Sequence, residues 1–384
     1  MADAARTIAV RLLPPVAILI FAGTLGVLLL SALSAGTFAC DYLVYDEAIR
    51  RFLGGGALYL SAGDPGGPCG SFQYPPPLVL LALPLMALPP SIDAWIATIG
   101  DVAAVLGGIA LFPVSARTRW LVLLLAGLSW PTMYALKLAQ VGPILLLVFV
   151  IGWRWMDRPI RVGAAIAIGA IVKIQPGLLL IWAFVTGRAR AVLVAVAILA
   201  VLSIAVTLAF GPRLWLDEIE LLASRSTPLA TAGLVTPGRV AIEAGLPEGL
   251  ALAIQLGSWA LAVVLVAIVL VRGSAVAAYM AFVVASQFLS PILWEHYAIV
   301  LLVPVAWLLG RGRWWAMVIP LLSSVPLVLI TPIVVYPIEY LGTLVLVVIE
   351  GVAEARRRPS TRAWRLLRSV PPPDPPESAE PALG

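Results

Sequence analysis

Residues 12–33 read LLPPVAILIFAGTLGVLLLSAL, an uncharged run of 22 residues that follows Arg6 and Arg11. A helix of roughly 20 apolar residues crosses a bilayer core of about 30 Å. The run is longer than the core of a usual signal peptide, and the residues before Cys40 make a poor lipoprotein site. We therefore interpret it as an uncleaved signal anchor, the first membrane helix of the chain.

The composition of the whole chain agrees with this start. Of its 384 residues, 61% are hydrophobic and 12% are charged, and the mean hydropathy is +1.03. A soluble domain is nearer half apolar and a quarter charged, and a water-facing fold of this length could not hide so much apolar side chain. The composition excludes a soluble enzyme, a nucleic-acid-binding module and a disordered protein, and it predicts a polytopic membrane protein.

Eleven further apolar runs predict membrane helices, some of them re-entrant. They are residues 76–90, 93–114, 120–138, 141–156, 162–186, 191–210, 249–271, 274–290, 296–310, 314–331 and 333–350. Together with the first run they predict an all-α fold of about 11–13 transmembrane or re-entrant helices. We expect this membrane domain to occupy residues 1–351, interrupted by two long polar loops, 34–75 and 211–248.

Two of these regions predict irregular helices. If 76–90 and 93–114 both crossed the bilayer, Arg117 and Arg119 would lie on the outside, against the positive-inside rule, so the alternative is that one of them is a partial, re-entrant segment. The run 162–186 has arginines on both flanks and a break at Lys173, Gln175 and Pro176. A hairpin of two half-helices would place both flanks on the same side.

The charges predict the orientation. The net charge of +5 is not gathered in one basic patch, which argues against a nucleic-acid partner. Both long loops are rich in acids, whereas the short loops are rich in arginine. In a protein of the cell membrane this difference predicts that both long loops lie outside the cell and both termini in the cytoplasm. Residues 352–384 are predicted to form a cytoplasmic tail, whose arginines at 356–368 suit anionic membrane lipids and whose Pro-rich end suits disorder.

Asp41 is the first candidate for chemistry, because it follows the first span at the outer face. The residues after it predict an interfacial helix that ends at Gly54–Gly56. A carboxylate at the bilayer boundary can have its pKa raised by desolvation, which suits a general base. The same position also suits an N-cap for that helix, and the residues alone favour this structural role.

A second candidate group is Glu295 and His296, which lie among apolar residues where ionisable groups are costly and usually functional. His296 is the only histidine of the chain. With Trp294, the group could instead belong to an aromatic belt with a snorkelling glutamate, although a belt does not need the Glu-His pair.

Two polar residues inside apolar runs complete the candidates. Lys173 needs a counter-ion or water in a membrane, so an anionic ligand such as a lipid phosphate is a natural partner, with snorkelling as the alternative. Gln140 lies between two apolar runs and suits either a polar tip of a site or a turn.

The two cysteines, Cys40 and Cys69, both fall in the first outer loop. Oxidation is possible there, so a disulfide and two free thiols are both open. Two cysteines and one histidine lack the spacing and ligand count of a metal site.

Taken in order, these stretches resemble glycosyltransferase family 87, a group of multispanning transferases with the C-type fold. The family pattern has an Asp after the first span, an aromatic-rich helix that ends in glycines, and Tyr-Pro-Pro before the next span. It continues with Gln-Val, a Lys before a Pro, and Ser-Pro-x-x-Trp-x-His. Here the corresponding residues are Asp41, Tyr45, Gly54–Gly56, Leu58-Tyr59, Tyr74-Pro75-Pro76, Gln140-Val141, Lys173 with Pro176, and Ser290 to His296. Tyr297 stands where members often carry a second His, which puts a paired-His role in doubt.

The resemblance implies a metal-independent transferase without a cofactor, acting at the outer face. It would move a hexose, typically mannose, from a polyprenyl-phosphate donor to a hydroxyl of a lipid-linked or cell-wall glycan, with inversion. By this resemblance Asp41 is the base and Asp46 the reserve, with Glu295 and His296 also catalytic. The implied donor and substrate contacts are Lys173, Gln140, Tyr45, Tyr59, Tyr74 and Trp294. The segment 211–248 is expected to shape the acceptor groove.

The competing class is a polytopic transporter or a lipid or glycan flippase. Its signature would be inverted repeats and several intramembrane charges along a path through the protein. The charges of this chain gather instead at the outer face, with Lys173 the main exception, which favours a lateral site that faces lipid. A purely structural membrane subunit is a third possibility, and polymerases or ligases of whole glycans are near neighbours of the transferase. The sequence makes no prediction of the oligomeric state.

Overall fold

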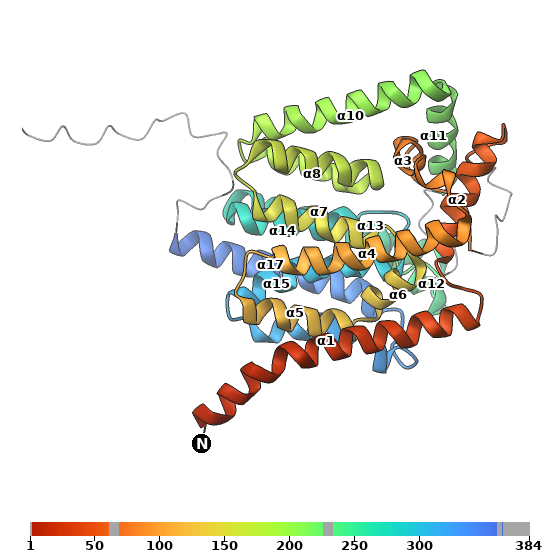
Figure 1. Cartoon of the computed structure of the whole chain (residues 1–384). Coiled ribbons are helices and arrows are strands. Elements are labelled where there is room, and N and C mark those ends of the chain that lie inside the picture. Colours follow the sequence, from red (N-terminus) through yellow and green to blue (C-terminus); the bar gives the residue numbers. More distant parts are fainter. Residues whose placement is uncertain (1, 61–68, 226–232, 359–362, 364–384) are drawn as a thin grey trace, which may run out of the picture.

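Long helices lie side by side across one slab, and their connections gather at its two ends (Figure 1). The computed structural model describes residues 2–60, 69–225, 233–358 and 363. In this part of the chain every regular element is a helix, and an isolated antiparallel bridge joins Ser129 and Ser324. The elements are α1 Ala2–Ser34, α2 Cys40–Leu53, α3 Pro77–Ala82, η1 Leu85–Ala87, α4 Pro90–Leu111, α5 Ala116–Leu128, α6 Trp130–Leu138, α7 Gly142–Arg154, α8 Pro159–Val172, η2 Gln175–Leu178, α9 Leu179–Val185, α10 Ala189–Phe210, α11 Arg213–Arg225, α12 Pro237–Glu243, α13 Glu248–Arg272, α14 Ala275–Phe288, η3 Glu295–Leu301, α15 Leu302–Gly310, η4 Trp314–Met317, α16 Val318–Leu322, η5 Val325–Leu327 and α17 Val335–Arg357.

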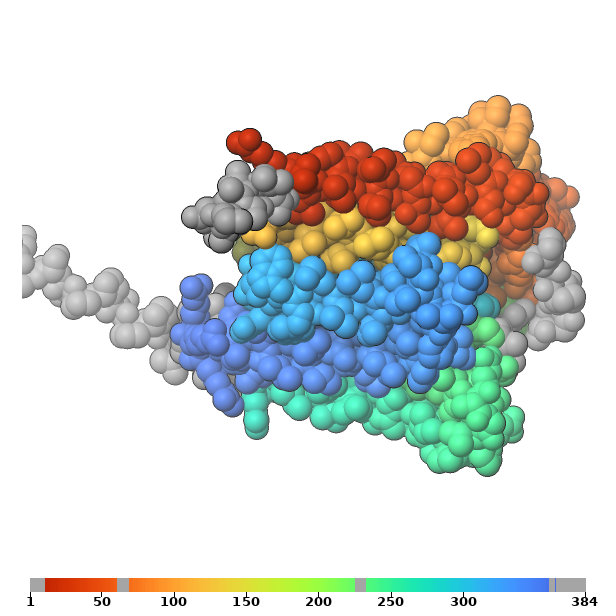
Figure 2. Space-filling model, turned by 90° about the horizontal axis from the view of Figure 1, so that it is seen from below, coloured from red at the N-terminus to blue at the C-terminus, as the bar shows by residue number. Residues whose placement is uncertain are grey.

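The prediction of an all-α polytopic membrane protein is confirmed. Within the described residues, five helices are long and apolar enough to span a membrane: α1, α4, α10, α13 and α17. The pair α6 and α7, bent by 118° at a short break, would make a sixth. The exposed side chains of these helices are largely apolar, as expected of surfaces that face lipid. Figure 2 shows one face of the molecule, along which the N-terminal helix α1 (red) and the C-terminal helices (blue) both run.

Several predicted runs are shorter or more broken than expected. Residues 76–90 and 314–331 do not form single helices. The first run contains α3, η1 and the start of α4, and the second contains η4, α16 and η5. Proline explains much of this, because it lacks the backbone N–H and clashes with the preceding turn. Pro84 separates α3 from η1, and Pro326 lies in the first turn of η5.

The break in 76–90 removes the conflict between two full crossings and the positive-inside rule at Arg117. Since α3 and η1 are too short to cross, α4 alone leads from the first long loop to the opposite end of the slab. There the Arg117 guanidinium lies 5.1 Å from the centroid of the Trp314 ring, and Arg154 donates to the Leu111 carbonyl at 3.1 Å. The alternative of a partial segment before α4 is therefore the one that the structure adopts.

The hairpin expected in 162–186 is also present. Helix α8 ends at Val172, Lys173 is extended, and η2 and α9 lead back along the hairpin. The two feet of the hairpin meet, since Arg188 Nε after α9 donates to the Met156 carbonyl before α8 at 3.0 Å. Lys173 consequently lies at the tip of the hairpin, far from both feet.

We name the two ends of the slab by their contents. The arginine end collects Arg117, Arg154, Arg188, Arg311 and Arg313, and two of them pair with α17: Arg311 with Glu354 at 2.6 Å and Arg313 with Glu350 at 2.8 Å. The opposite end carries α2, α3, α11 and α12 (Figure 1, right), and we call it the site end because α2 contains the candidate residue Asp41.

The last helix passes the predicted boundary of the membrane domain at residue 351. Helix α17 continues to Arg357, so the first arginines of the predicted tail are helical. The Pro-rich end, for which disorder is predicted, lies outside the described residues.

Small residues allow the closest helix contacts, as is usual in membrane bundles. Gly163 of α8 faces α10 so closely that a Cβ atom there would lie 2.6 Å from the Ala191 carbonyl oxygen and 2.7 Å from the Val194 Cβ. Gly257 of α13 has open space around it.

We expect Gly163→Ala to lower stability by about 1–3 kcal/mol, because the added methyl group forces α8 away from α10. Gly257→Ala is the matched control and should be neutral or slightly stabilising, since alanine favours a helix. Thermal unfolding of the purified variants in detergent measures both. Equal melting temperatures for the two variants would contradict this packing.

Candidate active site

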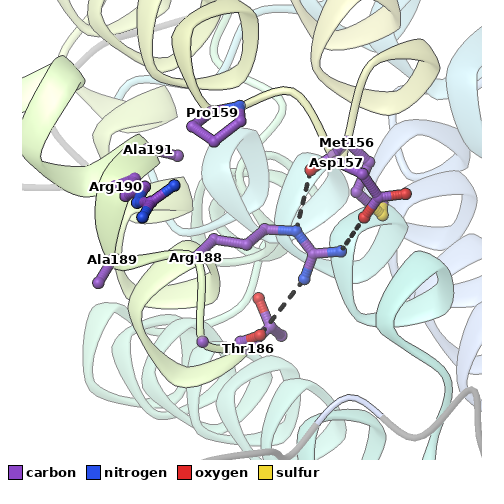
Figure 3. Close-up of a pocket in the computed structure, with 9 residues that line it drawn as sticks. Met156, Asp157, Pro159, Thr186, Arg188, Ala189, Arg190 and Ala191 are labelled. Atoms are coloured by element: carbon purple, nitrogen blue, oxygen red, sulfur yellow. Dashed lines mark hydrogen bonds and ion pairs between the residues drawn. The ribbon is translucent and has the colours of Figure 1, made fainter.

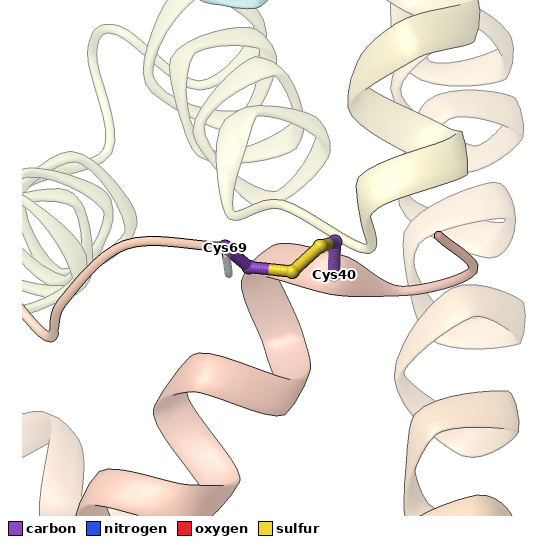
Figure 4. Close-up of a disulfide and its surroundings, with 2 residues drawn as sticks. All are labelled: Cys40 and Cys69. Carbon is purple, nitrogen blue, oxygen red and sulfur yellow. A yellow bond between two sulfur atoms is a disulfide. The ribbon is translucent and has the colours of Figure 1, made fainter. Parts of the chain in front are cut away.

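Asp41 lies in the first turn of α2, and both sides of this turn are tied to neighbouring segments. Cys40 forms a disulfide with Cys69, so the disulfide alternative is the one that the structure contains (Figure 4). Just before α2, the backbone N–H of Ala39 donates to the Lys137 carbonyl at 3.0 Å. Ala39, with a left-handed backbone and no side-chain cap bond, occupies the N-cap position. The alternative role of Asp41 as N-cap is therefore wrong.

Three elements bring ionisable side chains together around Asp41. His296 of η3 places its Nε2 atom 4.0 Å from Asp41 Oδ2. Lys173, at the tip of the hairpin, lies over the ring of Tyr297, with its Nζ atom 2.7 Å from the ring centroid. Burial raises the pKa of the Asp41 carboxyl to about 7, and the nearby Lys173 charge offsets part of that rise. A carboxylate with this pKa can take up and release a proton near neutral pH.

The nitrogen atoms beside Asp41 are buried and unsatisfied. Among the described residues, neither ring nitrogen of His296 nor the Lys173 amine has a hydrogen-bond partner. Buried polar atoms without partners are costly and rare in folded proteins. A ligand that brought oxygen acceptors to this point would satisfy the Lys173 amine and the ring N–H of His296.

A hydrogen-bonded cluster of tyrosines lies next to this centre. The hydroxyl groups of Tyr45 and Tyr74 are 2.5 Å apart, and Tyr59 donates to the Tyr74 carbonyl at 2.8 Å. Gln140 donates to the Tyr74 hydroxyl at 3.2 Å, while its oxygen accepts from the Gly142 N–H at 2.6 Å. Burial raises the pKa of the Tyr45 hydroxyl, and the Asp41 charge adds to that rise, so the cluster lies within electrostatic reach of Asp41.

This cluster decides between the two interpretations of Gln140. The residue forms the bend between α6 and α7, so it is a turn, and its amide also holds the tyrosine that faces the candidate site. All four predicted contacts, Tyr45, Tyr59, Tyr74 and Gln140, are buried, and their hydrogen bonds make them a rigid wall.

Glu295 and His296 are neighbours in sequence but point in different directions. Glu295 accepts a hydrogen bond from Trp130 Nε1 at 3.1 Å, on α6, whereas His296 faces Asp41. The ring of Trp294 lies parallel to that of His296, with centroids 6.4 Å apart. Glu295 is thus not brought to Asp41, and its contact holds η3 against α6.

The face of α6 beside η3 carries three residues that were not among the predicted site residues. Trp130 and Tyr134 stack with ring centroids 4.8 Å apart, and Tyr134 packs edge-on against His296 at 5.8 Å. Lys137 places its amine 5.6 Å from the Tyr134 ring centroid. Their spacing of four and three residues puts them on one helix face, and this spacing could have predicted from the sequence that they lie together.

Asp46, the reserve base, belongs to a separate ion-pair group. Its carboxylate accepts from Arg50 at 2.7 Å, and Arg50 also reaches Asp93 at 2.9 Å and the Met86 and Leu88 carbonyls. These contacts tie α2 to η1 and α4. Asp46 therefore has a structural role, and Asp41 is the stronger candidate for the base.

The second long loop reaches the site end. The backbone N–H of Val235 donates to the Leu293 carbonyl at 2.8 Å, and Gly233 approaches the Trp294 ring. In α11, Glu218 is buried with one carboxylate oxygen unpartnered, and burial raises the pKa of its carboxyl to about 7. The loop thus contacts the residues beside His296, and its predicted part in an acceptor groove stays a prediction.

Across the part of the chain that the structure describes, no group of three or more His, Cys, Asp or Glu side chains is arranged to hold a metal ion. The predicted metal independence stays a prediction.

The family model of glycosyltransferase family 87 matches residues 72–294, more than half of the chain. Tyr74, Gln140, Lys173 and Trp294 lie inside the matched region, whereas Asp41 and His296 lie outside it. Comparison with the curated proteins and with the solved structures gave no match.

We expect Asp46→Asn to cost about 1–3 kcal/mol of stability, because Arg50 loses a charged partner in a buried setting. Asp41→Asn should leave the stability unchanged or raise it, since that carboxylate is desolvated without a close ion pair. Thermal unfolding of both variants in detergent separates the two roles. A larger loss for Asp41→Asn than for Asp46→Asn would show that the assignment is reversed.

Proposed function

The chain belongs to glycosyltransferase family 87, and from this premise we propose that it transfers a hexose, most simply mannose, from a polyprenyl-phosphate donor to a glycan hydroxyl. The acceptor is a lipid-linked or cell-wall glycan. The observation that carries the proposal is the meeting of Asp41, with its desolvated carboxyl, and the unpartnered nitrogens of Lys173 and His296. Family membership also favours a transferase over the transporter class.

The proposed reaction is a direct displacement. Asp41 takes the proton of the acceptor hydroxyl as its oxygen attacks the anomeric carbon. The new carbon–oxygen bond forms as the bond to the phosphate oxygen breaks, and the polyprenyl phosphate leaves with that electron pair. One displacement inverts the anomeric centre, so a β-linked donor gives an α-linked product.

Lys173 and His296 are the proposed phosphate contacts. A bound phosphate would favour the protonated amine of Lys173, which would then stabilise the negative charge of the leaving group. His296 can donate to a phosphate oxygen while it stays beside Asp41. These groups act without a cofactor in this proposal, and the sugar donor is a substrate.

The tyrosine wall and the aromatic face of α6 would form the two sides of the sugar site. Tyr45 and Tyr74 present hydroxyl groups, and Trp294 and Trp130 present flat apolar surfaces that suit a sugar ring. Glu295 supports this arrangement by its bond to Trp130.

We also propose that the site end faces the outside of the cell and the arginine end the cytoplasm. The short arginine-rich loops support this orientation under the positive-inside rule. The Cys40–Cys69 disulfide supports it too, because disulfides persist in oxidising compartments.

Asp41→Asn should lower the transfer rate by about 10²–10⁴-fold, the range for loss of a general base. The assay uses purified protein in nanodiscs, radiolabelled polyprenyl-phosphate mannose and a membrane lipid extract as acceptor. In the wild type, the rate should fall as the pH drops through about 7, because a protonated Asp41 cannot accept a proton. Asp46→Asn is the control and should keep the wild-type pH profile. Full activity of Asp41→Asn would move the base elsewhere, and no transfer by the wild type would refute the proposed donor.

Two single cysteines test the orientation on intact cells. The Glu47 side chain is 69% exposed at the site end, and the Asp157 side chain is 94% exposed at the arginine end. A membrane-impermeant thiol reagent should label Glu47→Cys in intact cells, and Asp157→Cys only after the cells are opened. The opposite pattern would invert the proposed orientation.

A further inference from the structure

The arginine end contains a cavity of about 430 Å³ between the two feet of the hairpin. Figure 3 shows Arg188 in the middle of this region, with Pro159 and Arg190 on one side and Met156 and Asp157 on the other. The cavity lies at the opposite end of the hairpin from Lys173, and the proposed sugar chemistry does not use it. Its volume is within the usual range of small-molecule sites.

Arg188 is a fixed part of the cavity wall. It donates to the Met156 carbonyl at 3.0 Å, to the Thr186 carbonyl at 3.4 Å and to the Asp157 carboxylate at 3.3 Å. These bonds join the foot of α8 to the foot of α9. They also neutralise Asp157, the acidic residue of the described lining.

Arg190 supplies a second cationic charge, which the bonds of Arg188 to Asp157 and the two carbonyls do not involve. It lines the cavity and its side chain is exposed. Arg158 and Arg161, also exposed, stand at the start of α8 beside Pro159. The cavity and its rim therefore carry a net positive charge, which suits an anionic group.

The surface next to the cavity is apolar. Ile160 is 73% exposed at the start of α8, and Phe184 and Leu193 are exposed near the ends of α9 and α10 that border the cavity. An anionic head group in the cavity could therefore continue into acyl chains along these helices. Basic pockets between membrane helices commonly hold the head groups of anionic lipids.

We propose that this cavity binds the head group of an anionic phospholipid from the leaflet at the arginine end. The phosphate would contact Arg190 and the Arg188 side of the cavity, and the acyl chains would cover Ile160 and its neighbours. The bound lipid would hold the two feet of the hairpin together. This inference concerns the lipid alone and does not depend on the sugar substrate.

Native mass spectrometry of the detergent-purified protein can measure the binding of phosphatidylglycerol and phosphatidylcholine. We expect the wild type to bind phosphatidylglycerol about fivefold more tightly, the effect of about one arginine at a membrane surface. Arg190→Gln should remove this preference, and Arg190→Lys should keep most of it. Arg272→Gln is the matched control, an exposed arginine at the end of α13 outside the cavity, and should behave like the wild type.

Because Arg190 is exposed, none of its variants should change the melting temperature in phosphatidylcholine alone, so a loss of binding reports on the cavity. Equal affinity of the wild type for the two lipids would overturn the proposal. So would an equal loss of preference in Arg272→Gln, which would indicate a diffuse surface effect. If inorganic phosphate alone competes fully with phosphatidylglycerol, the site takes a free anion and the lipid assignment is wrong.

Discussion

A helix that breaks inside a membrane must satisfy its freed backbone groups within the protein, and the candidate site is built where such breaks meet. The hairpin breaks at Lys173, and the α6–α7 bend breaks at Gln140. The Gln140 side chain accepts from the Gly142 N–H, which repairs the second break from within. At a third break, before α6, the Trp130 N–H donates to the Ser323 carbonyl.

This arrangement explains how charged groups can be accommodated inside so apolar a chain. Lys173 extends from a helix tip rather than a helix face, so it reaches Tyr297 and the neighbourhood of Asp41. Asp41 comes to the same place from the first long loop, held by the disulfide on one side and the Ala39–Lys137 bond on the other. The result is one cluster of ionisable groups at one end of the slab, with structural ion pairs around Arg311 and Arg313 at the other.

Much of this could be predicted from local patterns. The apolar runs showed the helical membrane class, the arginines flanking 162–186 showed the hairpin, and glycines showed where α2 ends. The residues of the family pattern, from Asp41 to His296, indicated most members of the candidate site, whose roles stay predictions. Run length alone could not show the interruptions in 76–90 and 314–331, because apolar residues give the same signal in broken and continuous helices. The direction of Glu295 and the role of Trp130 depend on the contact between α6 and η3, 165 residues apart in sequence, which no local pattern encodes.

The most direct test of the account is the position of the donor. A cryo-electron-microscopy structure of the protein in nanodiscs with a non-transferable polyprenyl-phosphate sugar analogue would show it. We predict that the anomeric carbon lies beside Asp41, that the phosphate contacts Lys173 and His296, and that the prenyl chain leaves laterally towards lipid at the site end. A donor bound at the arginine end, or one whose phosphate lies away from Lys173 and His296, would contradict the central claim.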